Sequence, residues 1–242
     1  MRSGSYIIII GLTLLSTSFA YCLETKSDTS FLEQSKMNSI ALYTASFQNQ
    51  SRLYNGGDYI IYMPHDEEHP YYKSDDWSYG SIVYWGELYE NVPLLYDLSI
   101  DQAITEQNRG NAIRLVGEKV ESFTIFGHNF IRLRRDEKNK ISDGFYDRLY
   151  DGNSKVYAKY FKSYQQTMES TKVIPRFDES KKYYLVKDGT FYVVKTKASI
   201  LQVFDNHKQE VKNFIRKNRI RFKANRERAI AQVAEFYDTL KD

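Results

Sequence analysis

The chain has 242 residues, of which 42% are hydrophobic and 27% charged, and its formal net charge is +3. This composition is that of a globular protein, which excludes a disordered chain or a fibrous repeat. The near-neutral charge gives no overall attraction to nucleic acid. The single cysteine, Cys22, excludes an internal disulfide, so the fold must be stabilised by its core.

The first residues predict export. Arg2 precedes an apolar run over 6–15, and Ser18, Phe19 and Ala20 form a small-x-small cleavage pattern. The apolar run is about half of the roughly 20 residues that a spanning helix needs. We therefore expect residues 1–20 to be a signal peptide, and the mature protein to lie in the periplasm or at the cell surface without a transmembrane segment.

Residues 21–50 form an N-terminal segment that we expect to be partly helical. Apolar residues between 30 and 47 recur with a loose helical spacing, and Thr29 or Ser30 would serve as the N-cap. A strand over 40–47 is the alternative.

Residues 51–196 carry the pattern of an antiparallel β body. Short β-branched and aromatic runs alternate with turn residues, most clearly over 80–104, and Asp188-Gly189 marks a tight hairpin. The expected strands are 59–63, 81–85, 88–92, 94–98, 103–106, 112–116, 122–126, 129–133, 144–150, 155–164, 183–186 and 191–194. The charged or polar stretches 64–78, 134–142 and 165–180 are predicted as loops. The fold class is mainly β (α+β), with a curved antiparallel sheet or a partly open barrel.

Residues 197–242 predict helices that pack on the β body. Apolar residues recur at spacings of three and four residues, which indicates helices over 198–206, 207–217 and 225–240, the first two separate or continuous. The last helix has one apolar stripe that implies burial. Its members are Ala229, Ile230, Val233, Phe236, Tyr237 and Leu240.

The same C-terminal region is basic. Residues 197–228 contain ten Lys or Arg and three Asp or Glu. A solvated helical face is the ordinary interpretation of such a run. The alternative is binding to an anionic lipid surface, a polysaccharide or an acidic envelope protein, with Lys212, Arg216, Arg219 and Arg221 as contacts. Because the chain is expected to be exported, nucleic acid is not expected as a partner.

The loop over 64–79 holds the other candidate chemistry. His65, Asp66, Glu68 and His69 are metal-ligand types, and the two histidines are four apart. Flanking prolines disfavour a helix through them, so a solvated loop without a metal or other cofactor is the main interpretation. Trp77 follows two carboxylates and is a candidate contact for a sugar or protein partner.

The pattern resembles a group of uncharacterised exported proteins of Bacteroidetes-type bacteria. The segments that carry the resemblance are 80–97, 120–130 and 144–152, followed by the basic helices. The likeness covers about residues 50–240. It implies an exported protein with a single body, and it implies no activity and no site residues.

No catalytic motif accompanies these features. The sequence therefore predicts a non-catalytic exported envelope protein that binds or assembles with a macromolecular or surface partner. The alternative is a hydrolase, directed at polysaccharide or assisted by a metal, that uses the 64–79 loop.

Overall fold

The computed structural model describes residues 32–40, 52–62, 68–107, 110–169 and 172–240. The chain divides into two compact units, residues 1–46 and 47–242. In the first unit residues 32–40 are helical, as expected. The predicted signal peptide lies outside the described residues, and so does the alternative strand over 40–47 apart from Ile40, which belongs to the helix. Within the described part of the chain, no helix is long and apolar enough to span a membrane.

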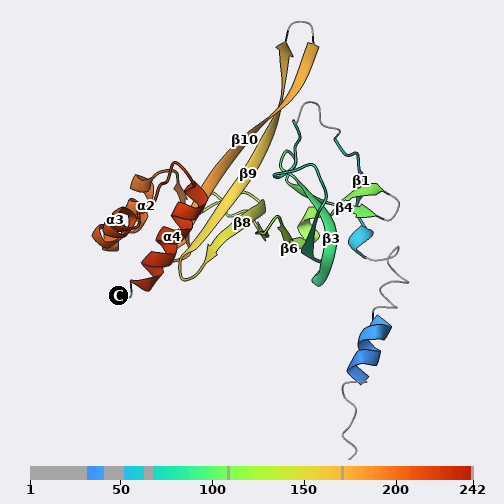
Figure 1. Ribbon diagram of the computed structural model, residues 1–242, viewed down its shortest axis with the longest axis horizontal. Helices are drawn as coiled ribbons and strands as arrows, with labels where there is room; N and C mark the ends of the chain where they lie inside the picture. Colours follow the sequence, from blue (N-terminus) through green and yellow to red (C-terminus); the bar gives the residue numbers. More distant parts are fainter. Residues whose placement is uncertain (1–31, 41–51, 63–67, 108–109, 170–171, 241–242) are drawn as a thin grey trace, which may run out of the picture. The chain divides into compact units, whose positions relative to one another are not determined.

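The second unit is mainly β, with helices at its C-terminal end (Figure 1). Its strands are β1 (Gly57–Tyr59), β2 (Ser78–Tyr84), β3 (Glu87–Asp97), β4 (Gln102–Gln107), β5 (Asn111–Arg114), β6 (Val120–Ile125), β7 (His128–Leu133), β8 (Gly144–Asp151), β9 (Lys155–Glu169), β10 (Lys172–Lys187) and β11 (Thr190–Val194). Its helices are α2 (Lys197–Val203), α3 (Lys208–Lys217) and α4 (Arg226–Thr239), with short 3₁₀ turns at Arg52–Tyr54, Gly117–Lys119 and Asp205–His207.

The strands form one open antiparallel sheet in the order β1-β5-β4-β3-β2-β6-β7-β8-β9-β10-β11. From β6 onward each strand pairs with its neighbour in sequence, because short turns join consecutive strands. Three hairpin turns of the sheet have two central residues with positive φ, as type I′ hairpins require: Trp85-Gly86, Phe126-Gly127 and Asp188-Gly189. The predicted mainly-β antiparallel fold is confirmed, as an open sheet.

Two of the predicted strand divisions differ from the structure. The expected strand over 59–63 is instead β1, which ends at Tyr59. The expected break between 88–92 and 94–98 is absent, because β3 runs through Pro93, which pairs with Tyr79 close to a register shift between Gly80 and Ile82. Such an irregularity tolerates a residue that cannot donate to the ladder.

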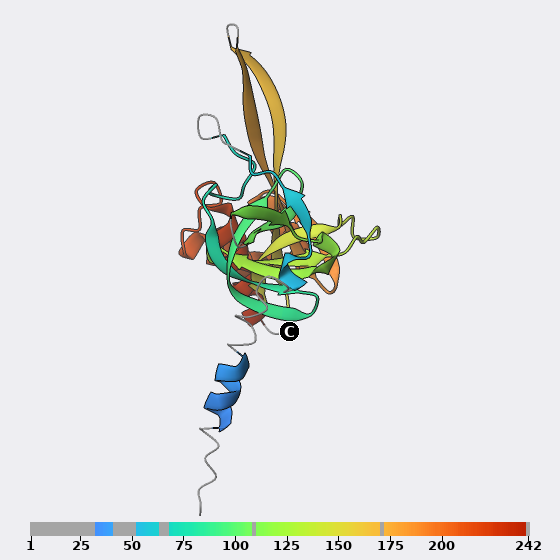
Figure 2. The ribbon, with the colours of Figure 1, turned by 90° about the vertical axis from the view of Figure 1, so that its right-hand side faces the viewer.

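The prediction of a loop over 165–180 is wrong. Most of it belongs to β9 and β10, whose register runs from Lys155↔Val186 to Glu169↔Lys172. Only 155–158 of β9 also pairs with β8, and only 183–187 of β10 also pairs with β11. The outer parts therefore form a two-stranded ribbon that extends past the flanking strands in both views (Figures 1 and 2). Its described side chains are mostly exposed, so the hydrophobic alternation that marks a half-buried strand is missing.

The main core is built mostly from strand side chains, and the C-terminal helices cover the part of it at β8 to β11. Val156, Ala158 and Leu185 from β9 and β10 meet Ile230 and Val233 from α4. Ala229, Ile230 and Val233 are buried, and Phe236, Tyr237 and Leu240 are partly buried against the same core. The predicted apolar stripe of the last helix therefore packs on the β body. The 3₁₀ turn at Asp205–His207 separates α2 from α3.

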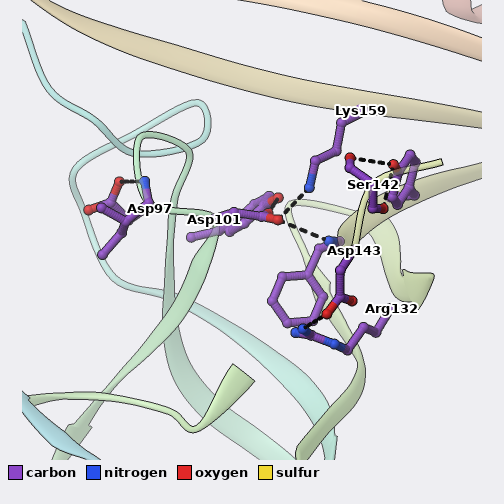
Figure 3. A network of polar contacts seen from close by, with 10 residues as sticks. Asp97, Asp101, Arg132, Ser142, Asp143 and Lys159 are labelled. Atoms are coloured by element: carbon purple, nitrogen blue, oxygen red, sulfur yellow. Dashed lines mark hydrogen bonds and ion pairs between the residues drawn. The ribbon is translucent and has the colours of Figure 1, made fainter. Parts of the chain in front are cut away.

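A buried ion pair fixes the middle of the sheet (Figure 3). The Lys159 side chain on β9 is 2% exposed and donates to the carboxylate of Asp101, which precedes β4. Asp101 also accepts from the Tyr96 hydroxyl at 2.5 Å and from the Phe145 amide at 3.3 Å. Burial lowers the pKa of Lys159, and the Asp101 carboxylate opposes this effect. One carboxylate thus joins β3, β8 and β9 at a single point.

Glycine is required beside this pair. Gly144 begins β8 with φ +141, and a Cβ there would lie 2.0 Å from a carboxylate oxygen of Asp101. Arg132 and Asp143 form a second pair next to it, at 2.7 Å. Because the polar groups around Lys159 bond to one another, we interpret the network as part of the scaffold.

We expect Lys159→Met to destabilise the protein by about 3 kcal/mol, because it leaves Asp101 partly buried without its cation. Chemical denaturation measures the loss. Lys155→Met on the same strand is the control, since Lys155 and Asp151 form an exposed pair that is worth less than about 1 kcal/mol. Equal small losses for both variants would contradict a structural role for the buried pair.

Candidate functional site

A basic hollow of about 460 Å³ lies among the C-terminal helices. Five cations line it, together with Gln209, Asn213, Ile215 and Ile220. The cations are Lys197, Lys212, Arg216, Arg219 and Arg221. The four basic residues that the sequence singled out are thus brought together, and Lys197 is a fifth that sequence reasoning did not select.

Helix α3 supplies one wall of the hollow because it is amphipathic. Val211 and Ile215 are buried in the core, whereas Lys212 and Arg216 are exposed and lie one turn apart. Residues four apart share a helix face, so both cations follow the same side of α3. Lys197, the first residue of α2, also borders the hollow. It is half-buried, and it starts a helix whose N-cap Thr196 makes a capping box with Ser199.

The turn after α3 supplies the other two cations. The Ile220 amide donates to the Ile215 carbonyl at 3.0 Å, and Arg219 lies between them with φ +51. A Schellman motif at a helix end has this six-to-one hydrogen bond and a left-handed residue just before the donor. Glycine usually occupies that left-handed position. An arginine there carries a backbone cost of roughly 1–2 kcal/mol relative to the right-handed region. Residues held in such conformations cluster at functional sites.

The charge of the hollow is not neutralised by its surroundings. In the ranges that the structure describes, no carboxylate lies within ion-pair distance of the five cations, and none lines the hollow. Among the described residues, the Arg216 side chain donates only to the Asn213 amide oxygen, at 3.4 Å. A concave surface with charge of one sign concentrates counterions, so this hollow has the electrostatics of an anion site.

A second hollow of about 320 Å³ adjoins the first. Arg219, Ile220 and Arg221 line both of them, so the turn after α3 forms the ridge between the two. The second hollow adds Arg228 from the first turn of α4, and its remaining lining residues carry no charge. Helix α4 begins at the N-cap Asn225, whose side chain accepts from the Arg228 amide at 2.9 Å.

The metal hypothesis for the 64–79 loop gains no support. His65 and Asp66 lie outside the described residues. Glu68 accepts from the Phe177 amide at 2.7 Å, and the Nδ1 atom of His69 accepts from the Tyr71 amide at 3.2 Å. Burial and the nearby Lys162 lower the pKa of His69. Among the described residues, no three metal-type side chains converge on one point.

Trp77 does not join the basic residues. It is half-buried against a small cluster that contains Tyr71, Leu95 and Ile104, and it lines neither basic hollow. Tyr71 and Tyr72 of the same region are buried in the body. Tyr71, Tyr72 and Trp77 of the 64–79 loop therefore pack against the body.

A larger hollow near the end of α4 lies where this helix packs against two turns of the sheet. It measures about 640 Å³ and is lined by residues of the β8–β9 and β10–β11 turns and of α4. Asp238 accepts from the Ser154 amide at 2.8 Å and from the Tyr150 hydroxyl at 3.0 Å. Lys187 donates to Asn206 at 3.1 Å. These bonds attach the helices to the sheet.

Comparison with protein-family models, with curated proteins and with solved structures found no match for this chain. Family membership therefore assigns no residue a role, and the case for the site rests on its geometry and charge.

Proposed function

We propose that the chain is a non-catalytic exported envelope protein that docks onto an anionic macromolecular partner through the basic hollow of its C-terminal helices. The observation that carries the proposal is the convergence of five cations on one hollow with no carboxylate in its wall. A merely solvated helical face has its basic residues spread over convex surface, and it commonly interleaves them with acids.

The β body supports this role by holding the helices in place. The α4 helix is packed into the main core through Ile230 and Val233, and Asp238 is bonded to the turn before β9. A site that is ordered before binding loses less conformational entropy when the partner arrives. The Asp101 carboxylate is shared by Lys159, the Tyr96 hydroxyl and the Phe145 amide, which fits a structural role for this network.

The direct test replaces three cations of the hollow, as Lys212→Glu, Arg216→Glu and Arg221→Glu together. The phosphate groups of a phosphocellulose column serve as the anionic probe. We expect the variant to elute at much lower salt than the unmodified protein, because attraction within the hollow becomes repulsion. Melting temperature checks that the variant is folded.

The matched control replaces three exposed cations on the β7–β8 connection, as Arg134→Glu, Lys138→Glu and Lys140→Glu. It changes the net charge by the same amount and leaves the hollow intact. If the two variants elute together, net charge alone determines retention and the proposal fails.

Substitution of Arg219 gives a second test, in which we expect stability to rise and anion binding to weaken. Arg219→Gly places the favoured residue at φ +51, so we expect a gain in stability of about 0.5–1 kcal/mol and a higher melting temperature. We also expect weaker retention on phosphocellulose, because a guanidinium is lost from the hollow. Lys223→Gly is the control, since it removes an exposed cation that lines neither hollow. Unchanged retention of Arg219→Gly would show that Arg219 has no part in binding.

A further inference from the structure

The two basic hollows share the turn that carries Arg219 and Arg221. A ligand with one anionic group would occupy one hollow and leave the other unneutralised. A ligand with successive anionic groups would place one on each side of this ridge. From this arrangement we propose that the site takes a linear chain of phosphoryl groups that spans both hollows. The inference rests on the proposed function and specifies its ligand.

Arginine content favours phosphoryl groups over carboxylates. The charged residues of the second hollow are Arg219, Arg221 and Arg228, with no lysine among them. A guanidinium donates two parallel hydrogen bonds to one oxyanion group. In a phosphoryl chain the oxyanion groups follow one another directly, whereas the carboxylates of a polypeptide are separated by backbone. A phosphoryl chain therefore places more acceptor oxygens within reach of the two guanidinium groups that the shared turn supplies to each hollow.

The surface around the hollows disfavours an anionic membrane as the ligand. The helices that bind in a bilayer interface bury a large apolar face among the lipid chains. None of the large hydrophobic residues of α2, α3 and α4 is among the exposed ones of the described chain. The cations also border hollows, whereas a membrane presents a flat sheet of charge. A flexible chain that enters the hollows matches this shape better.

The test measures the affinity of the full chain for inorganic polyphosphate of defined length, from inorganic phosphate through tripolyphosphate to longer chains, at constant ionic strength. We expect affinity per chain to rise at least tenfold, beyond the increase in the number of phosphoryl groups, once the chain is long enough to span the ridge. Poly-glutamate of matched charge should bind more weakly. Vesicles of phosphatidylcholine with phosphatidylglycerol should bind more weakly as well.

Arg228→Gln separates the second hollow from the first. We expect it to lower affinity for long polyphosphate by about fivefold, which corresponds to one exposed charge-assisted contact, and to leave inorganic phosphate binding unchanged. Arg226→Gln is the matched control, because Arg226 is exposed in the same helical turn but lines neither hollow. It lies over the Tyr183 ring instead.

Three results would overturn the inference. Equal effects of Arg228→Gln and Arg226→Gln would exclude the second hollow, and an affinity that does not depend on chain length would exclude a spanning ligand. Equal binding of vesicles or poly-glutamate would exclude phosphoryl selectivity. Each of these results leaves the proposed function intact if the charge reversal of the first hollow (Lys212→Glu, Arg216→Glu and Arg221→Glu together) still weakens binding to anionic ligands. If that reversal has no effect on any probe, the proposed function fails as well.

Discussion

The interaction on which the sheet depends most is the contact between Lys159 and Asp101 in the middle of the second unit. Removing an ammonium from water is costly, and the burial of Lys159 lowers its pKa, an effect that a neighbouring carboxylate opposes. Asp101 provides that carboxylate and also binds β3 and β8 through Tyr96 and the Phe145 amide. A single displaced strand would leave several of these groups unsatisfied. The network therefore specifies one arrangement of the strands at its centre.

Strand β9, which carries Lys159, connects the buried ion pair to the C-terminal helices. Its inner residues pair with β8 and β10, its apolar face packs against α4, and the turn before it receives Asp238. The helices are thus attached at one end by hydrogen bonds and along their length by buried side chains. The opposite surface of α3 and the turn after it are left to carry charge. The packed face and the charged face of these helices are therefore different, and Arg219 lies on the charged side in a left-handed conformation that glycine would adopt at lower cost.

Much of the fold could be predicted from local sequence, because its strands are joined by short turns and its helices have clear apolar stripes. Asp188-Gly189 and the stripe of α4 are examples, and both lie where the pattern placed them. The outer ribbon of β9 and β10 could not be predicted, since a strand exposed on both faces has no alternation. The Lys159–Asp101 contact was also missed, because a lysine in an aromatic strand reveals no partner 58 residues away. For the site, the basic run indicated four of the cations, but their convergence depends on the turn after α3 and on α2, which position Lys197 and Arg219 by tertiary packing.

The central claim is that anionic ligands bind at the turn between α3 and α4 while the sheet remains a fixed support. The most direct measurement is a titration of the isotopically labelled full chain with tripolyphosphate, followed by amide chemical shifts in NMR spectra. We predict saturable shifts concentrated in residues 212–228 and near Lys197, with amides of residues 155–160 unmoved. Shifts concentrated instead in residues 68–79, or spread over the strands without saturation, would contradict the claim.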